Sequence, residues 1–375
     1  MVTIRPGRDT LPRERICWEM GLWARGAPRF TRDNRKGVFR MTDLKTRLAA
    51  GAAGTAIALF AALPQAAADG VELTAVAGLQ PTNPLTMSFV ANLIEPLKKA
   101  GAGVVTIRYA GGPEVVPPTK AAKAVERGQF DMLNSPVSYY IGTVPEGYAM
   151  LASNVPVAEV RKNGGWELLN EVFNKKAGSQ LIAWAEAPTK YNMYLSVEPK
   201  FKDGVPDLSG IKMRATGTYR PLFRALGAST INMKESEIYT GMERGVVQGF
   251  GWPETGVPAL GLHKLVKHRI NPGFYATNHA TTINLSKWKS LTQQQKDVLM
   301  KAIAEYEKVA PAFMAKHAEA DTKTLRAAGV KEVNLEGKAA NKYLSIAYGE
   351  IWKELGERSD YAEKLRAKLY RDPAS

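Results

Sequence analysis

Arg214 is the residue whose type and position in this sequence best suit ligand chemistry. It follows the apolar residues Ile211 and Met213, at the predicted end of a β-strand. A guanidinium at such a place can hold a carboxylate by two parallel, charge-assisted hydrogen bonds. A structural role, in which Arg214 caps a helix or pairs with an acidic side chain, agrees equally well with its position. Taken alone, Arg214 marks a candidate anion site and leaves both roles open.

Other residue patterns give no support for catalysis. The sequence has no His-Glu-x-x-His, no Gly-x-Ser-x-Gly and no phosphate-binding Gly-x4-Gly-Lys-Ser/Thr. Gly249-x-Gly251 begins like a dinucleotide fingerprint, but Glu254 stands where the third glycine is needed. The histidines lack the i, i+4 spacing of a helical metal site, and we interpret them as surface or core residues. We therefore predict no enzyme activity, no cofactor and no metal. The four histidines are His263, His268, His279 and His317.

The composition excludes several further classes of protein. With 375 residues, 45% of them hydrophobic and 23% charged, the chain is typical of a soluble globular protein of two or three lobes. Its one cysteine, Cys17, excludes a disulfide scaffold and a cysteine-rich metal site. Residues 1–68 hold 12 Lys or Arg against 5 Asp or Glu, so about half of the net charge of +15 lies there. Later basic clusters are short and mixed with acidic residues, which argues against nucleic acid as a partner.

Residues 41–68 have the pattern of a secretory signal peptide. Two basic residues precede an uncharged, Ala-rich stretch, and three alanines directly before Asp69 supply the small residues that signal peptidase needs. The apolar stretch is shorter than the ~20 residues that span a bilayer, so we expect cleavage before Asp69 and not a retained anchor. Met41 is at the right distance to be the initiator, and we interpret residues 1–40 as a mis-assigned start or a disordered segment. The remaining chain has no cysteine, which suits an oxidising periplasm.

The elements that must position Arg214 are predicted from the chain after residue 70. Strands at Val71–Val76, Val104–Tyr109 and Phe130–Leu133 are separated by helices at Pro84–Lys99 and Thr119–Arg127. This order indicates βαβ units on a mostly parallel sheet, and ligands bind outside the carboxyl ends of such strands. The loops at those ends are Gly78–Thr86, Gly111–Pro117 and Asn134–Tyr140.

A second cycle of strands and helices begins near residue 191. The repeated order predicts two α/β lobes and not one large sheet. We place lobe 1 at residues 69–191 together with about 280–320, and lobe 2 at residues 192–279 together with about 321–375. The second cycle has strands at Tyr191–Val197, Ile211–Ala215, Ser229–Met233 and Val246–Phe250 and helices at Tyr219–Leu226 and Glu235–Arg244.

A long helix is predicted from Thr292 to Ala328. Thr292 and Gln295 fit a capping box at its start, and the element would be roughly 55 Å long if it were all helical. Pro311 should kink or divide it. An element of this length can lie across both lobes.

Several segments together resemble the periplasmic solute-binding subunits of TRAP (tripartite ATP-independent periplasmic) transporters, in the dicarboxylate-binding family. The strongest match is Leu208–Pro253, where a Leu-x-Gly-x-Lys-x-Arg strand ends at Arg214. The similarity runs from about residue 71 to 365. The matching pieces are Leu226-Gly227-Ala228, Glu237-Ile238-Tyr239, Gly245-Val246-Val247 followed by Gln248 in place of Asp, and the segments GGPEVVP, WKSLTQQQKDVL and AAGVKEVNL.

The resemblance implies a two-lobed α/β fold of the periplasmic-binding-protein type (class II), with mixed sheets, crossing hinge strands and a long C-terminal helix across both lobes. It implies that the lobes close over a ligand whose carboxylate Arg214 holds. Asn192 stands where sialic-acid binders of the family have a second arginine, and Gly251 stands where the branch resembling keto-acid binders often has a cation-binding Glu. Trp252 is shared with that branch, although a plain core role also suits it. The expected ligand-binding residues are Arg214, Trp252, Tyr219, Glu114, Asn83, Ser135, Tyr139 and Asn192.

The resemblance further implies a receptor that delivers an organic acid anion to small and large integral-membrane permease subunits. With one secure arginine and several aromatic residues, we expect a monocarboxylate such as a 2-keto, 2-hydroxy or aromatic acid. Two alternatives stay open: a C4-dicarboxylate with Lys190 or Arg220 as a second clamp, and a sensory protein of the same fold.

Overall fold

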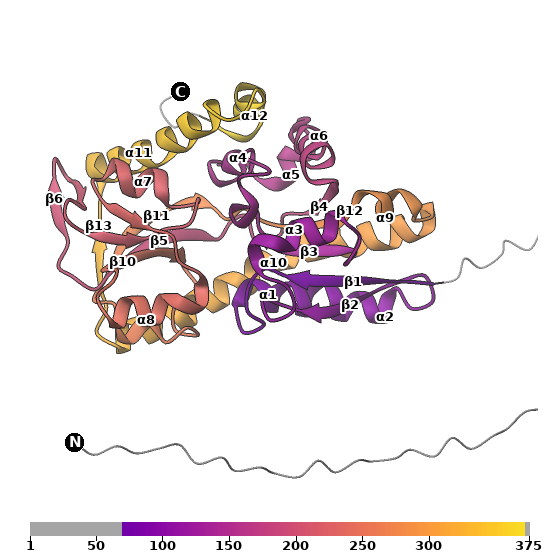
Figure 1. The fold of residues 1–375 in the computed structure, drawn as a ribbon, viewed down its shortest axis with the longest axis horizontal. Coiled ribbons are helices and arrows are strands. Elements are labelled where there is room, and N and C mark those ends of the chain that lie inside the picture. The colour runs from indigo at the N-terminus through magenta and orange to yellow at the C-terminus, as the bar shows by residue number, and fades with distance from the viewer. Residues whose placement is uncertain (1–69, 372–375) are drawn as a thin grey trace, which may run out of the picture. The chain divides into compact units, whose positions relative to one another are not determined.

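Two β-sheets form the centre of residues 70–371, which are the part of the chain that the computed structural model describes (Figure 1). The first sheet has the order β2-β1-β3-β12-β4. β1 is parallel to β2 and β3, whereas β12 is antiparallel to β3 and β4. The predicted signal peptide lies outside the described residues. The strands of this sheet are β1 (Val71–Ala77), β2 (Val105–Gly111), β3 (Met132–Pro136), β4 (Ser179–Ala183) and β12 (His279–Asn284).

The second sheet has six strands in the order β13-β11-β5-β10-β8-β9. It is mixed, because β10 is parallel to β8 but antiparallel to β5. β6 (Lys200–Lys202) and β7 (Val205–Asp207) form a separate hairpin. The two main sheets and the long helix confirm the predicted two-lobed α/β fold. The strands of the second sheet are β5 (Lys190–Leu195), β8 (Lys212–Arg214), β9 (Ser229–Ile231), β10 (Gly249–Pro253), β11 (His268–Ala276) and β13 (Lys331–Asn334).

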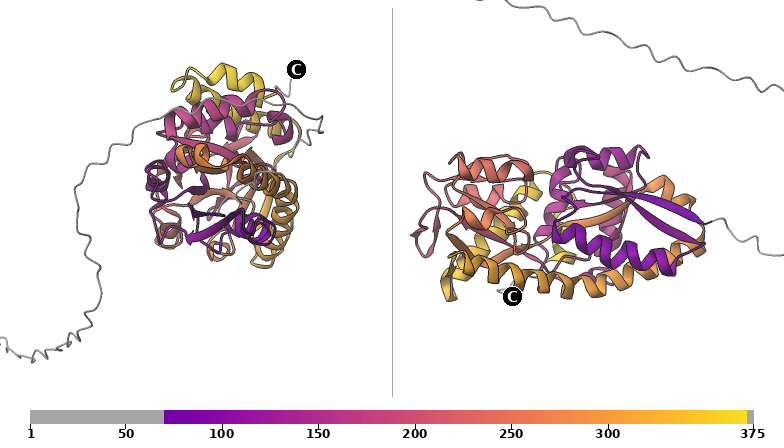
Figure 2. Two further views of the ribbon diagram at one scale, coloured as in Figure 1. Left: turned by 90° about the vertical axis from the view of Figure 1, so that its right-hand side faces the viewer. Right: turned by 90° about the horizontal axis from the view of Figure 1, so that it is seen from below.

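Helices cover both sheets (Figure 2). None of those between residues 70 and 371 is both long and apolar enough to cross a membrane. The α-helices are α1 (Pro84–Phe89), α2 (Glu95–Ala100), α3 (Pro118–Glu126), α4 (Gly147–Leu151), α5 (Val157–Val160), α6 (Gly165–Ala177), α7 (Arg220–Ala225), α8 (Ile238–Glu243), α9 (Leu285–Ser290), α10 (Gln293–Ala327), α11 (Gly337–Gly356) and α12 (Ala362–Leu369). A π-helical turn, η1 (Val90–Ile94), joins α1 to α2, and the 3-10 helices are η2 (Val137–Tyr140), η3 (Glu235–Glu237) and η4 (Leu262–Lys264).

Most predicted elements lie within a few residues of the observed ones, but the strand predicted at Val246–Phe250 is displaced toward the C-terminus. β10 spans Gly249–Pro253, and Val246 is exposed in the turn before it. A Cβ on Gly249 would lie 2.6 Å from the carbonyl oxygen of Tyr194 in β5. The close approach of the backbones in the centre of the sheet therefore outweighs the low strand propensity of glycine.

Helix α10 packs against both lobes (Figure 2). Its Leu299 and Ile303 belong to the apolar cluster around β1 and η1, whereas Leu325 belongs to the cluster around Phe250. The capping box is confirmed, since Gln295 N donates to Thr292 Oγ1 at 3.2 Å and Thr292 N to Gln295 Oε1 at 3.0 Å. Of the two expected effects of Pro311, a kink or a division, the division is wrong, because α10 continues through the proline. Burial of Ala310 and Met314 on either side of Pro311 outweighs the hydrogen bond that the proline removes.

Two crossing segments join the sheets, residues 184–189 after β4 and residues 277–278 before β12. They are bonded to each other: Trp184 Nε1 donates to Thr277 O and the Thr277 hydroxyl donates to Glu186 O, both at 2.5 Å. The C-terminal helices also touch both halves, since α11 packs against α4 and α7, and α12 against α4 and α6. The two sheets are therefore linked by a hinge of two hydrogen-bonded crossing segments and by the C-terminal helices α11 and α12.

Candidate functional site

Arg214 is the last residue of β8 and is 1% exposed. Its position follows from parallel pairing on both sides, with Phe250 in β10 and Ile231 in β9. Nε donates to Met233 O at 3.0 Å, while Nη2 has no hydrogen-bond partner among the described residues. One edge of the guanidinium is thus held by the protein, and the other offers a buried donor that a carboxylate can satisfy.

A cavity of about 20 Å³ lies beside Arg214, between the two lobes. Four of the predicted ligand residues line it: Arg214, Tyr219 and Trp252 from the second lobe, and Tyr139 from the first lobe. The Arg214 Cζ lies 5.5 Å from the centre of the Trp252 ring, within the range of a cation–π contact. The other lining residues are Leu79, Leu85, Pro136, Ser138, Tyr191, Thr216, Thr218 and Pro253.

The two lobes are in contact at this cavity. The Thr218 hydroxyl donates to Ser138 Oγ at 2.5 Å across the cleft. A volume of about 20 Å³ is that of roughly one water molecule. The cleft is therefore closed, and an organic ligand enters only if the lobes move apart.

Gly251 allows the ring of Tyr219 to reach the cavity. A Cβ at Gly251 would lie 2.3 Å from Cδ1 of Tyr219, so no larger residue fits without moving the ring. Tyr219 packs edge-on against Tyr191, with ring centres 5.4 Å apart. The ring of Tyr219 therefore occupies the space that a side chain at position 251 would take. No group of three His, Cys, Asp or Glu residues within the described range is arranged to hold a metal ion.

Asn83 and Glu235 connect the lobes close to Arg214. Asn83 Oδ1 accepts from Leu85 N at 3.0 Å and caps α1, which turns its amide nitrogen toward Glu235 Oε1 at 3.3 Å. Burial raises the pKa of the Glu235 carboxyl, and hydrogen bonds from Asn83 and the backbone of Gln80, with the charge of Arg214, oppose that rise. The Glu235 carboxylate therefore lies near Arg214, whose Nη2 is available to bind an anion.

Glu235 was missed in the sequence because its only signal is position. It lies two residues after Met233, whose carbonyl oxygen accepts from Arg214, and it starts a predicted helix. An acidic residue in a first helical turn is common for reasons of helix stability alone.

Four predicted ligand residues do not line the cavity: Asn83, which caps α1, and also Ser135, Glu114 and Asn192. Ser135 is buried, donates to Pro136 O at 3.3 Å and packs against Gly78. Glu114 is exposed, and its Oε1 accepts from Gly112 N at 2.7 Å. Both side chains therefore bond to their own loops.

Asn192 pairs with Trp252 in the register of β5 and β10, but its side chain contacts β11. Its Nδ2 donates to Ile270 O at 3.0 Å and to Asn271 Oδ1 at 2.9 Å, and its Oδ1 accepts from Arg269. Lys190 and Arg220, the candidates for a second clamp, do not line the cavity either. Arg214 is accordingly the one cationic side chain in its lining.

Comparison with known protein families shows to which family the chain belongs. The family described as bacterial extracellular solute-binding protein, family 7, matches residues 77–358. The chain belongs to this family. The predicted resemblance to solute-binding subunits is thereby confirmed. One relative, a solute-binding protein of Albidiferax ferrireducens, is 24% identical over 292 residues, which cover 74% of this chain and 83% of that protein.

Solved structures with the same fold are TRAP periplasmic solute-binding proteins. One from Rhodoferax ferrireducens, with bound malonate, is 21% identical, has a TM-score of 0.69 and is matched over 79% of this chain and 96% of its own. One from Bordetella bronchiseptica, with calcium and picolinate, is 20% identical with a TM-score of 0.69, over 80% and 91%. One from Colwellia psychrerythraea, with calcium and pyruvate, is 19% identical with a TM-score of 0.69, over 80% and 93%. These likenesses show that this chain has the same fold as those proteins.

Proposed function

We propose that this protein is a periplasmic receptor that binds a monocarboxylate and delivers it to a TRAP membrane permease. The observation that carries the proposal is the buried guanidinium of Arg214, whose Nη2 is without a partner among the described residues and which lines a cavity between two lobes. Family membership supports the receptor role. The small acids named for the solved relatives, malonate, picolinate and pyruvate, support a carboxylate ligand.

The charges around the cavity favour one carboxylate over two. Arg214 is the only cation in the lining, and Glu235 already lies near it. A second ligand carboxylate would be buried without a positive partner, which is costly. Aromatic rings of Tyr139, Tyr219 and Trp252 suit an uncharged remainder, as in a 2-keto, 2-hydroxy or aromatic acid.

Binding in this proposal requires the lobes to open and close. The moving bodies are the two lobes, one around each main sheet, and α12 stays with the first lobe, against whose helices α4 and α6 it packs. Hinge closure around a ligand is a common motion in such receptors. We further propose that export with cleavage before Asp69 brings the receptor to the periplasm, where small and large integral-membrane subunits accept the acid. Solution scattering should show smaller dimensions with saturating ligand than without it.

The test compares Arg214→Ala with Arg224→Ala, an exposed arginine on the neighbouring helix α7 that does not line the cavity. A thermal-shift screen of organic acids first identifies a ligand for the wild type. Removing one partner of a buried charge pair costs about 2–5 kcal/mol, so Arg214→Ala should weaken binding by roughly 30- to 5,000-fold. Arg224→Ala should bind as the wild type does. Wild-type affinity in a folded Arg214→Ala protein would remove Arg214 from the site.

Competition between pyruvate and succinate tests the ligand class separately. Pyruvate should displace the identified ligand at the lower concentration. A succinate preference of about tenfold or more, which is 1.4 kcal/mol, would show that a second cation serves the site.

A further inference from the structure

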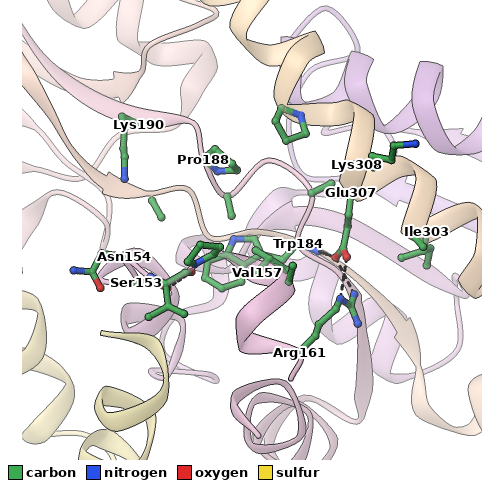
Figure 3. Close-up of a pocket in the computed structure, with 18 of the residues that line it drawn as sticks. Ser153, Asn154, Val157, Arg161, Trp184, Pro188, Lys190, Ile303, Glu307 and Lys308 are labelled. Carbon is green, nitrogen blue, oxygen red and sulfur yellow. Dashed lines mark hydrogen bonds and ion pairs between the residues drawn. The ribbon is translucent and has the colours of Figure 1, made fainter. Parts of the chain in front are cut away.

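A second cavity, of about 730 Å³, lies at the hinge (Figure 3). It shares no lining residue with the cavity beside Arg214. Its walls are residues 153–158 and Arg161 around α5, the crossing segment with Lys190 at the start of β5, the end of β11, and α10 between Met300 and Pro311. Its volume lies within the range of about 300–1,000 Å³ that is typical of small-molecule sites.

Small side chains leave this space open. Alanines contribute to every wall, from the segment before Arg161, the crossing segment, the end of β11 and helix α10. Prolines and larger apolar side chains such as Val157 and Ile303 complete a lining that is mainly apolar. The alanines are Ala158, Ala185, Ala187, Ala276 and Ala304.

One ion pair in the lining is already satisfied. Arg161 binds Glu307 through Nε at 2.9 Å and Nη2 at 2.8 Å, and Nη2 also donates to Ile182 O at 2.9 Å. Glu307 Oε1 in addition accepts from Trp184 N at 2.9 Å. This pair therefore holds α10 to the crossing segment and offers no net charge to a ligand.

Two lysines in the lining leave an excess of positive charge. In Figure 3, Lys190 and the Arg161–Glu307 pair lie on opposite sides of the hollow. Burial lowers the pKa of Lys190, and the charge of Glu254 opposes this effect. Lys308 lies on the exposed face of α10 and pairs with Glu305 at 3.6 Å. An anionic group next to Lys190 would offset the cost of burying its ammonium.

From this lining we propose that the hinge cavity is a second ligand site, which takes a carboxylate with an extended apolar body, and that its occupancy is coupled to opening of the cleft. The apolar walls receive the body, and Lys190 receives the carboxylate. The walls belong to a crossing segment and to α10, both of which join the lobes, so lobe rotation changes the shape of the cavity. A ligand that fits one of the two states better shifts the balance between them.

Decanoate is the probe, and isothermal titration calorimetry on the full protein measures its binding. Ala304→Glu places a negative charge in the lining at an exposed helical position, and Lys190→Gln removes the positive charge. Ala312→Glu is the matched control, because residue 312 is exposed on the same helix outside the lining. We expect one decanoate per chain, binding about tenfold or more weaker in Ala304→Glu and in Lys190→Gln, and wild-type binding in Ala312→Glu.

Arg214→Ala separates this site from the cleft. It should lose the cleft ligand and keep decanoate. Loss of decanoate in Arg214→Ala, full retention in both Ala304→Glu and Lys190→Gln, or no wild-type binding up to about 1 mM would each overturn the second site. Saturating decanoate should change the affinity for the cleft ligand several-fold in the wild type and not in Ala304→Glu. An unchanged wild-type affinity would overturn the coupling.

Discussion

Replacing Glu235 by glutamine tests the electrostatics of the cleft most directly. The glutamine keeps an oxygen that accepts from Asn83 and Gln80, but it removes the negative charge near Arg214. A ligand carboxylate bound to Arg214 would therefore lie near the Glu235 carboxylate, on which the charge of Arg214 already acts. We therefore expect Glu235→Gln to bind a monocarboxylate more tightly than the wild type.

The size of the effect follows from the repulsion between two carboxylates. For two carboxylates about 6 Å apart, with an effective dielectric constant of about 20, this repulsion is about 3 kcal/mol. That energy corresponds to roughly 100-fold in the dissociation constant. The wild type can reduce the repulsion by protonating Glu235, because burial already raises its pKa and a bound anion raises that pKa further.

The pH dependence has a definite sign. Since the complex has the higher pKa at Glu235, it holds more protons than the free protein, and ligand binding takes up protons. Wild-type affinity should therefore be full below the pKa of the free protein and fall as pH rises toward the pKa of the complex. Calorimetry from pH 5 to pH 8.5, in buffers of different ionisation enthalpy, measures both the affinity and the proton uptake.

The control is Glu243→Gln, an exposed carboxylate at the end of α8. It should reproduce the wild-type curve. Glu235→Gln should bind about 10- to 100-fold more tightly at pH 8 and show little change with pH. An affinity and a proton uptake equal to those of the wild type would refute the placement of Glu235 beside the bound carboxylate.

Three further predictions concern stability and closure. Burial raises the pKa of Glu186, in the hinge, to about 7. The free energy of unfolding should therefore be highest below about pH 4.5 and fall by about 3 kcal/mol as pH rises through 7. Thermal melts should show a smaller fall in Glu186→Gln, and parallel pH curves for the two proteins would contradict this prediction. Gly251→Ala should displace the Tyr219 ring and cost about 1–3 kcal/mol in urea unfolding, with weaker ligand binding; a wild-type midpoint would show that the ring moves freely. Asn83→Ala removes both the cap of α1 and the hydrogen bond to Glu235. We expect the free energy of unfolding to fall by about 1 kcal/mol and the dimensions measured by solution scattering to increase. Unchanged scattering would show that Asn83 acts as a helix cap alone.

Local pattern was enough to predict many of the elements, including the strand that ends at Arg214. The capping box at Thr292 and the apolar strand ending in Arg214 depend on side chains a few residues apart, so the sequence shows them directly. The order of strands and helices predicted two α/β lobes for the same reason. Motifs spread over Leu208–Pro253 identified the family.

Only the tertiary structure decided which side chains meet Arg214. Asn83 and Glu235 are 152 positions apart and are joined by closure of the cleft, which no local pattern encodes. Asn192 is opposite Trp252 in register, yet its amide binds β11, because β5 is paired on both edges and side-chain hydrogen bonds go to whichever strand offers a partner. The hinge cavity likewise arises where alanines from four separate segments come together, and an alanine in a sequence does not reveal whether its neighbours fill the space beside it.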